Sequence, residues 1–326
     1  MRFLTSIALG LIGVATAAAP PALTRYEAHR LSMACTYDIA AYGDPSSDVP
    51  ALLERALDEV DRVDRLMSHY KPESPLSQLN RTAADGAVVV DPELFEFIAR
   101  SIAYSRDSGG AFDVTVGPLM KAWGFFKGDG RVPSKTELTG VMRRVGHQHV
   151  VLDRSSRTIR FDVAGVEIDL GGIAKGYAVD RVAALLREHG IPAALISAGG
   201  STVYGLGHPP DRASWEVKVQ DPLEPSKIAF TVDLENRALS MAGRSAKTFE
   251  RNGVLYSHIM DPRTGRPVQG VVAVAVTSET GTEGDALDDA VFVMGLERSR
   301  NYLRQFPGAS AWLWLQSGKR ARLVPL

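Results

Sequence analysis

Apolar residues repeat every three or four positions in several stretches of the chain, and this spacing predicts amphipathic helices. Capping signals mark where two of them begin: Asp91 precedes Pro92, and Ser134 lies three residues before Glu137. Gly190 marks the end of a third. The predicted helices span about 50–67, 91–108, a short stretch after Ser134, 172–189, a stretch opening at Asp285, and 297–306.

Short runs of alternating apolar and polar residues predict strands, most of them in the C-terminal half. The alternation is clear in Trp215–Gln220, so one face of its sheet should contact water. Helices interrupt the strands irregularly, which favours an α+β fold with a mostly antiparallel sheet and flanking helices. The predicted strands are His149–Asp153, Thr158–Phe161, Val166–Leu170, Ala194–Ser197, Trp215–Gln220, Ile228–Leu234, Val271–Thr277 and Ala311–Leu315, with Cys35 in the first strand of the mature chain.

The N-terminus has the layout of a secretory signal peptide, predicted over residues 1–17. Arg2 precedes an apolar run, and Ala15-Thr16-Ala17 supplies the small residues of a cleavage site. An uncleaved N-terminal anchor is the alternative. Cys35 is the only cysteine, so no intramolecular disulfide can form, and the residues before it make no convincing lipobox. We therefore expect an exported, periplasmic protein, either soluble or held by its N-terminal segment.

The rest of the chain, residues 18–326, has the composition of one globular domain. Over the full chain of 326 residues, hydrophobic residues make up 45%, charged residues 23%, and the formal net charge is −1. This balance gives no electrostatic reason to expect a nucleic-acid partner. The sequence also lacks a Gly-x-Ser-x-Gly elbow, an HExxH motif and paired cysteines, which argues against a serine hydrolase and a zinc site.

The clearest chemical signal runs from Val166 to Arg181. A strand-like run breaks at Gly171-Gly172, and a helix pattern follows at once. Two glycines there let another molecule approach the backbone, and a helix N-terminus favours an anion such as a phosphate. Asp169 and Lys175 flank the turn with opposite charges. A tightly packed turn without a ligand is the alternative.

Three aspartates crowd the start of another predicted helix. Asp285, Asp288 and Asp289 share one helix face and repel one another unless positive charge neutralises them. Carboxylate oxygens suit Mg²⁺ or Ca²⁺, and Mg²⁺ commonly joins carboxylates to substrate phosphates. The cluster predicts a metal site. The alternative is an acidic first turn that only complements the helix dipole.

Further candidate groups lie elsewhere in the chain. His258 precedes a probable turn and could act as a general base. Asp113 lies in a glycine-dense segment that fits either a ligand-facing loop or a packed corner. Tyr70 offers an aromatic platform before a polar loop, although tyrosine in such a place is more often partly buried.

Taken together and in this order, these segments resemble the ApbE-type FAD:protein FMN transferase family. The resemblance runs from Met33 to Asp289 and is carried by GAFDVTVGPL (110–119), IDLGGIAKGYAVD (168–180) and HIMDPRTGRP (258–267). It implies a single ApbE-like α+β domain and an exported, Mg²⁺-dependent enzyme. Such enzymes use FAD as the donor and attach FMN through a phosphoester to a Ser or Thr of an acceptor protein, releasing AMP.

The resemblance also implies roles for individual residues. His258 would be the general base. The acceptor would carry a Ser/Thr flavinylation motif, with a subunit of a membrane-associated redox complex as one candidate. The metal would be surrounded by Asp285, Asp288, Asp289 and the carbonyl of Gly172. The FAD site would be lined by Met33, Tyr70, Ala111, Phe112, Asp113, Asp169, Lys175 and Ile259.

Four departures from the family pattern keep other functions open. Asp289 replaces a threonine, Ser257 replaces the first histidine of a pair, and Ser201 stands where an aspartate is usual. Residues 240–245 replace a Thr-Ser-Gly segment and the tyrosine after it. The alternatives are hydrolysis of FAD to FMN and AMP, and a non-catalytic flavin-binding protein.

Overall fold

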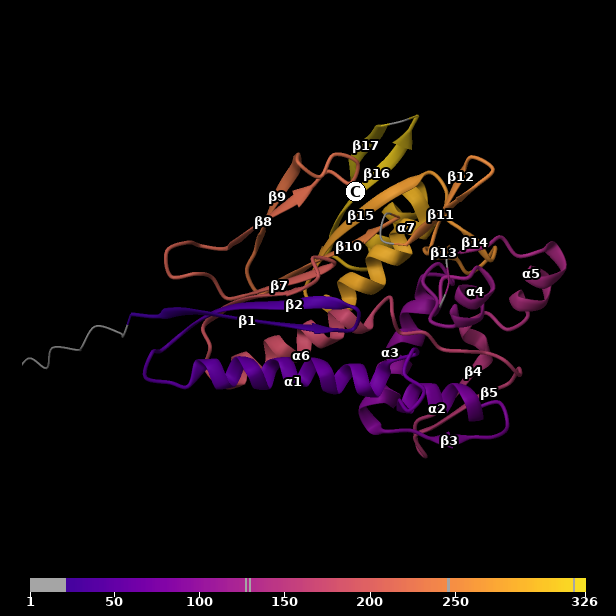
Figure 1. Cartoon of the computed structure of the whole chain (residues 1–326), viewed down its shortest axis with the longest axis horizontal. Coiled ribbons are helices and arrows are strands. Elements are labelled where there is room, and N and C mark those ends of the chain that lie inside the picture. The colour runs from indigo at the N-terminus through magenta and orange to yellow at the C-terminus, as the bar shows by residue number, and fades with distance from the viewer. Residues whose placement is uncertain (1–21, 127, 129, 245–246, 319) are drawn as a thin grey trace, which may run out of the picture.

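An eight-stranded antiparallel sheet forms the central layer of the fold (Figure 1). This computed structural model describes residues 22–126, 128, 130–244, 247–318 and 320–326; the predicted signal peptide lies outside them and stays a prediction. In spatial order the strands are β1 (Thr24–Ser32), β2 (Cys35–Gly43), β6 (Ala193–Ala198), β7 (Thr202–Leu206), β10 (Arg237–Gly243), β15 (Val271–Ser278), β16 (Ser310–Ser317) and β17 (Arg320–Pro325).

Both faces of this sheet are covered at its centre. Along β15, Val274 and Val276 join the core shared with the helices, while Ala273 and Ala275 join a second core. Helices α1 (Val49–Met67), α6 (Ala174–Glu188) and α7 (Gly281–Leu303) cover the first face, and the hairpin β8–β9 (Trp215–Gln220, Ile228–Leu234) covers the second. Burial on both sides explains why β15 is a continuous apolar run rather than an alternating one.

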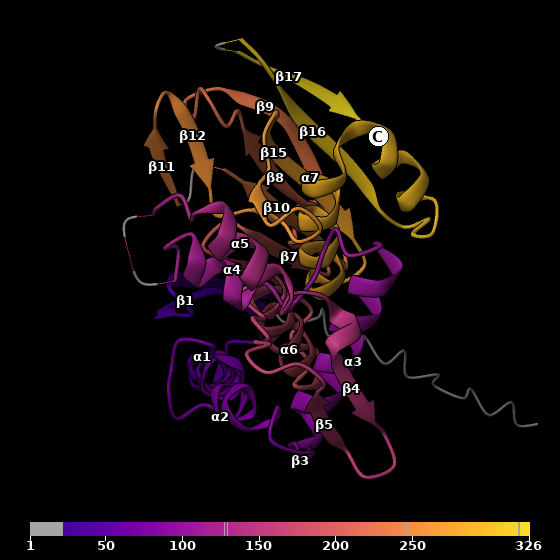
Figure 2. The same cartoon turned by 90° about the vertical axis from the view of Figure 1, so that its right-hand side faces the viewer.

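A group of shorter elements lies at one end of the sheet, on the right in Figure 1 and facing the viewer in Figure 2. It includes a third hydrophobic core around Trp123 and Met260. The remaining elements are α2 (Pro75–Thr82), α3 (Pro92–Asp107), α4 (Gly117–Ala122), α5 (Lys135–Met142), η1 (His147–His149), β3 (Val88–Val89), β4 (Val150–Asp153), β5 (Thr158–Phe161), β11 (Thr248–Arg251), β12 (Val254–Ser257), β13 (Met260–Asp261) and β14 (Arg266–Pro267).

The predicted helix boundaries that rest on caps are confirmed. The Asp91 side chain accepts hydrogen bonds from the first turn of α3, and the Ser134 hydroxyl accepts one from the Glu137 N–H. Gly190 follows α6 with φ 76°, a left-handed conformation that glycine adopts without strain. A capping hydrogen bond joins residues only a few positions apart, so it forms independently of the tertiary fold.

The predicted strand over Val166–Leu170 is wrong. The segment is extended and buried, but its backbone groups bond to other partners than a neighbouring strand. The Asn80 amide accepts from the Ile168 N–H at 2.8 Å and donates to the Ile168 carbonyl at 2.8 Å, and the Asp169 N–H donates to the Val114 carbonyl. The Asn80 side chain therefore supplies the hydrogen bonds that a neighbouring strand would otherwise supply.

The two predicted C-terminal helices differ from the structure in their boundaries. α7 begins at Gly281 behind the N-cap Thr280, so a helix opening at Asp285 was wrong. The separate helix over 297–306 is the last part of α7, which runs to Leu303 and is interrupted at Gly295 (φ 68°, ψ −172°). Because the aspartates lie beyond the first turn, the alternative that they only complement the helix dipole loses its basis.

Several strands carried no clear signal in the sequence. All five residues of β7 are buried, and β10 is buried at most positions, so neither shows an alternating pattern. Both lie in the middle of the sheet, between β6 and β15. Among the described residues, none of the helices has the length and apolar composition needed to cross a membrane.

We predict that Asn80→Ala lowers the free energy of unfolding by about 2–4 kcal/mol, because two buried backbone groups of Ile168 lose their partner. Urea denaturation of the mature protein measures this. Gln78→Ala on the same helix removes an exposed hydrogen bond and should change stability by less than about 0.5 kcal/mol. Equal effects of the two variants would contradict the role given to Asn80.

Candidate functional site

α6 and α7 approach one another closely at two glycines. A Cβ at Gly176 would lie 2.1 Å from the Gly281 carbonyl oxygen, so no larger residue fits without moving a helix. Asp180 of α6 accepts hydrogen bonds from the N–H groups of Gly281 and Thr282 and from the Thr282 hydroxyl. This contact fixes the first turn of α7 against α6 and so places the aspartates that follow.

Asp285 joins three elements. Its Oδ2 accepts from the Gly176 N–H at 2.7 Å, and its Oδ1 accepts from the hydroxyls of Thr202 (2.6 Å) and Ser240 (3.0 Å). These donors come from α6, β7 and β10. Burial raises the pKa of Asp285 to about 6, against the opposing effect of these donors and of Lys175.

Asp288 and Asp289 complete a concentrated negative charge. Burial and the neighbouring carboxylates raise the pKa of Asp288 well above its usual range, and burial followed by repulsion from Asp285 raises that of Asp289 to about 7. Lys175 opposes the rise in all three aspartates. A Cβ at Gly172 would lie 2.6 Å from Asp289 Oδ2, so the Gly-Gly turn and the acidic cluster meet.

The donor chemistry here fits a divalent cation that is completed by a substrate. Within the described ranges, no three His, Cys, Asp or Glu side chains are arranged to hold a metal ion by themselves. Asp285 already accepts three hydrogen bonds, so Asp288, Asp289 and the carbonyl of the adjoining Gly172 turn are the freer oxygen donors. Burial is the main cause of the raised pKa values in this cluster, so a bound cation would favour the ionised carboxylates. Mg²⁺, which often keeps open positions for phosphate oxygens, suits such a partial site.

Lys175 lies at the start of α6 and connects this cluster to the sheet. Its Nζ donates to the Ser201 hydroxyl at 2.8 Å, in the turn between β6 and β7. Gly199 of the same turn lies against Cys35, because a Cβ at Gly199 would be 2.7 Å from Cys35 Cβ. Met33 and Ala34 precede Cys35 in the β1–β2 turn with φ 49° and 61°, a conformation that costs energy for residues other than glycine.

Tyr70 contributes an aromatic wall. Its ring is 39% exposed and stacks on Phe126 with centroids 4.8 Å apart. Lys247 Nζ lies 5.8 Å from the Tyr70 ring centroid, and Lys121 Nζ lies 5.1 Å from that of Phe126. Each ring of the stacked pair therefore has one lysine beside it, an arrangement that suits a planar, anionic ligand.

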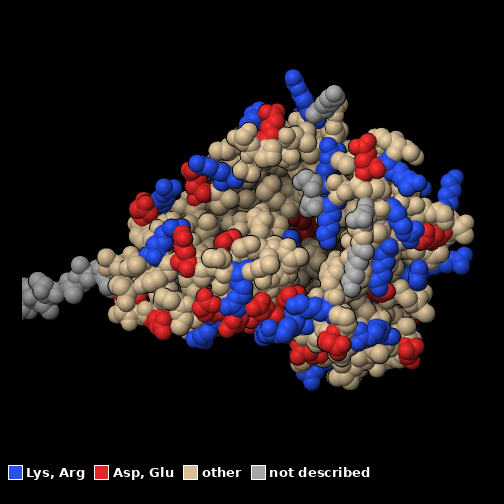
Figure 3. Space-filling view, viewed as in Figure 1, with Lys and Arg blue, Asp and Glu red and all other residues tan. Residues whose placement is uncertain are grey.

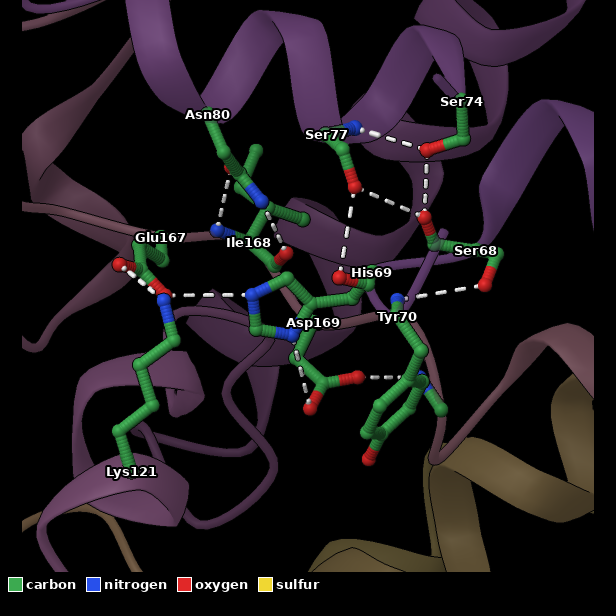
Figure 4. A network of polar contacts seen from close by, with 11 residues as sticks. Ser68, His69, Tyr70, Ser74, Ser77, Asn80, Lys121, Glu167, Ile168 and Asp169 are labelled. Carbon is green, nitrogen blue, oxygen red and sulfur yellow. Dashed lines mark hydrogen bonds and ion pairs between the residues drawn. The ribbon is translucent and has the colours of Figure 1, made fainter. Parts of the chain in front are cut away.

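His69, next to Tyr70, lies between two carboxylates (Figure 4). Its Nε2 is 3.2 Å from Glu167 Oε2, and its Nδ1 is 3.4 Å from Asp169 Oδ2. Lys121 Nζ lies 2.6 Å from the same Glu167 Oε2, and the Gly171 N–H donates to Asp169 Oδ1 at 2.9 Å. Burial alone would lower the pKa of His69, but the two carboxylates together raise it to about 9, so the imidazole is charged at neutral pH.

His258 has the opposite protonation state. Burial, followed by the positive charge of Lys247, lowers its pKa to about 4, so the ring is neutral at pH 7. Its Nδ1 is buried and has no hydrogen-bond partner among the described residues. A neutral imidazole with an unpaired ring nitrogen is able to take a proton from a bound hydroxyl.

Most of the other predicted FAD-site residues are buried. Ala111 and Phe112 are buried, and Phe112 lies beside Gly172. Asp113 accepts from the N–H and hydroxyl of Thr115 and contacts His147 at 2.9 Å, so its carboxylate organises its own loop. Ile259 is also buried.

The space-filling view shows a hollow in the middle of one face, with acidic and basic side chains at its bottom (Figure 3). A cavity of about 690 Å³ lies elsewhere, beside α4 and α5, and is lined by Lys121, Glu167, Arg131 and Arg144 among others. None of the predicted FAD-site residues lines that cavity. The chemistry of the aspartate cluster, rather than cavity size, therefore identifies the candidate site.

The sequence analysis missed the supporting residues of this site. Glu167, Lys121 and Phe126 were not singled out, nor was Thr202 as a partner of Asp285. One signal was available in the sequence. Glu167 and Asp169 lie two positions apart, on either side of Ile168, so in an extended segment both carboxylates point to the same side. Two carboxylates on one side are stabilised by a shared cation. His69 is that cation.

Comparisons with known proteins agree on one family. The sequence model of the ApbE family matches residues 33–313. The FAD:protein FMN transferase of Treponema pallidum (strain Nichols) is 32% identical over 293 residues, covering 85% of this chain and 80% of the relative. That of Escherichia coli (strain K12) is 29% identical over 260 residues, covering 78% of this chain and 74% of the relative.

Solved structures show the same fold. The ApbE protein from Thermotoga maritima MSB8 matches with a TM-score of 0.85 at 29% identity, covering 93% of this chain and 97% of that one. The flavin transferase ApbE from Vibrio cholerae matches with a TM-score of 0.83 at 26% identity, with the same coverage. The predicted family resemblance and the predicted single-domain α+β fold are confirmed.

We predict that His69 makes stability fall as pH rises. Its pKa is about 9 in the folded protein and near 6.5 when exposed, so between these pH values the folded state keeps a proton that the unfolded state has lost, and stability falls until the folded state also loses it near pH 9. Between pH 6 and pH 10 this contributes up to about 3 kcal/mol to the loss of stability. Urea denaturation of wild type and His69→Gln at both pH values isolates the effect; an equal loss in both proteins would contradict the assignment.

Proposed function

The chain belongs to the ApbE family, and we propose that it transfers FMN from FAD to a Ser or Thr hydroxyl of an acceptor protein, releasing AMP. The named relatives support flavin transfer in general. The Mg²⁺ requirement, the Ser or Thr acceptor and the residue roles are our inferences from the site.

One observation carries the proposal. The aspartates of α7, whose pKa values are raised, lie against the Gly-Gly turn and the N-terminus of α6. Asp285, Asp288, Asp289 and the Gly172 carbonyl would hold Mg²⁺. Bound there, the ion would neutralise charge on the pyrophosphate oxygens of FAD. Lys175, at the start of α6, places a second positive charge beside the same oxygens.

The remaining predicted residues orient the donor. Tyr70 supplies an exposed ring for stacking against the flavin or the adenine, and Asp169 offers a carboxylate beside that ring. Phe112, which lies beside Gly172, and the buried Ala111 and Ile259 would supply apolar contacts to the donor. A substrate held in this way needs little further rearrangement to react.

His258 activates the acceptor in this proposal. Its neutral ring takes the proton of the Ser or Thr hydroxyl as the oxygen attacks the phosphorus of the FMN moiety. A bond forms between that oxygen and phosphorus, the bond from phosphorus to the bridging oxygen breaks, and AMP leaves with the bond's electrons. The buried, partnerless Nδ1 of His258 is the observation that favours this role.

We also propose that the enzyme acts outside the cytoplasm, on a periplasmic or membrane-associated acceptor. The support is the predicted signal peptide and the single cysteine, which leaves no structural disulfide to form after export. A fusion of residues 1–17 to a periplasm-dependent reporter tests the export step.

Incubating the mature protein with FAD, Mg²⁺ and an acceptor fragment carrying a Ser/Thr flavinylation motif tests the function. Transfer adds the mass of FMN to the acceptor and releases an equal amount of AMP. Free FMN with AMP would instead show a pyrophosphatase, and unchanged bound FAD would show a non-catalytic flavin-binding protein.

We predict that His258→Ala retains FAD binding and loses transfer by roughly 10²–10⁴-fold, the usual contribution of a positioned base. Single-turnover release of AMP measures this. His208→Ala, at an exposed histidine, is the matched control and should behave as wild type. Wild-type turnover in His258→Ala would assign proton removal to another group.

We predict that Asp289→Thr, which introduces the residue of the family pattern, keeps Mg²⁺-dependent transfer, because the hydroxyl still offers an oxygen ligand. Asp289→Ala should lower transfer at least about tenfold and require more Mg²⁺, since it removes that ligand. Titrating transfer against Mg²⁺ in both variants measures this. Full activity of Asp289→Ala at wild-type Mg²⁺ concentrations would remove Asp289 from the metal site.

A further inference from the structure

A buried imidazole connects two acidic residues on one side of the candidate FAD site. His69 is 8% exposed and has a carboxylate beside each ring nitrogen: Nε2 is hydrogen-bonded to Glu167 at 3.2 Å, and Nδ1 lies 3.4 Å from Asp169 Oδ2, an ion-pair distance without hydrogen-bond geometry. A carboxylate beside each nitrogen favours the charged imidazole, which carries a proton on both. The contact therefore joins one positive ring to two carboxylates (Figure 4).

The two carboxylates depend on His69 to different degrees. Glu167 has a second cation, because Lys121 Nζ lies 2.6 Å from its Oε2 and 2.7 Å from its Oε1. In the described part of the chain, the recorded polar contacts of the Asp169 carboxylate are His69 and the Gly171 N–H. Asp169 is 7% exposed, so its charge is held by one imidazole and one backbone dipole.

The same imidazole touches the aromatic wall. Its centroid lies 4.9 Å from that of Phe126 and 5.9 Å from that of Tyr70, and these two rings stack on each other. Asp169 also acts electrostatically on the Tyr70 hydroxyl. One side chain thus fixes a carboxylate and two rings relative to each other.

We propose that His69 is a positioning residue for FAD: its charged ring holds the Asp169 carboxylate and the Tyr70 ring in the arrangement that binds the donor. The inference rests on the proposed function, which places Asp169 and Tyr70 at FAD. His69 itself acts through Asp169, so its loss weakens FAD binding and leaves the chemical step intact. Glu167 serves to keep His69 charged and oriented, and Lys121 holds the Glu167 carboxylate in place.

Two substitutions separate the two contacts of the ring. The amide nitrogen of asparagine lies close to the place of Nδ1, and that of glutamine close to the place of Nε2. His69→Asn keeps a donor for Asp169, whereas His69→Gln keeps a donor for Glu167 and leaves Asp169 without one. A purely structural role for His69 would not distinguish the variants in this order.

The experiment measures the Kd of FAD by titration calorimetry and the KM and kcat for AMP release. We expect His69→Gln to raise the Kd and KM about tenfold and His69→Asn about threefold or less, with kcat within about twofold of wild type. His149→Gln is the matched control, since His149 pairs with a different carboxylate, Asp162, at 2.8 Å. Unchanged Kd in His69→Gln, or a larger effect of His69→Asn, would overturn the proposal.

A double-mutant cycle tests the route through Asp169. In an Asp169→Asn background, His69→Gln should cause no further loss of FAD affinity, whereas independent losses would overturn the coupling. If neither His69 variant folds, the ¹⁵N shifts of the His69 ring in wild type should move on FAD binding; unmoved shifts would overturn the proposal. Wild type that binds FAD without modifying an acceptor would refute the proposed function and leave this binding test intact.

Discussion

Three carboxylates of α7, two buried and one half-buried, lie within little more than one helical turn, and this concentration of charge constrains the rest of the site. Burial raises the pKa of Asp285, Asp288 and Asp289, and the positive charge of Lys175 only partly opposes the rise. Burial opposes the ionisation of these carboxylates, and a divalent cation would offset that cost. In our proposal the acidic cluster is one half of a site that the cation and FAD complete.

Contacts from the sheet and from α6 fix the position of the acidic cluster on α7. Close approach at Gly176 and Gly281 brings the start of α6 to α7, and donors from β7 and β10 fix Asp285. Ser201 receives a hydrogen bond from Lys175 but carries no charge. Where the family pattern has an aspartate at this position, serine leaves the lysine's charge available to the cluster and to phosphate.

Features set by nearby residues could be predicted from the sequence. The caps at Asp91 and Ser134, the Gly-Gly turn and the acidic face of α7 all depend on residues within one or two turns, and all are present in the structure. Features set by distant residues could not be predicted. The clearest case is the segment around Ile168, where Asn80 replaces the expected neighbouring strand. The same holds for His69, whose two carboxylates lie about a hundred positions away in the chain.

The most direct test of this account is the melting temperature of the mature protein with Mg²⁺ alone, FAD alone, and both together. If the cation and the pyrophosphate share the charge of the α7 cluster, each strengthens binding of the other, and the shift with both should exceed the sum of the separate shifts. Additive shifts, or a shift with FAD that is indifferent to Mg²⁺ and EDTA, would contradict the claim that Asp285, Asp288 and Asp289 form a site completed by metal and FAD.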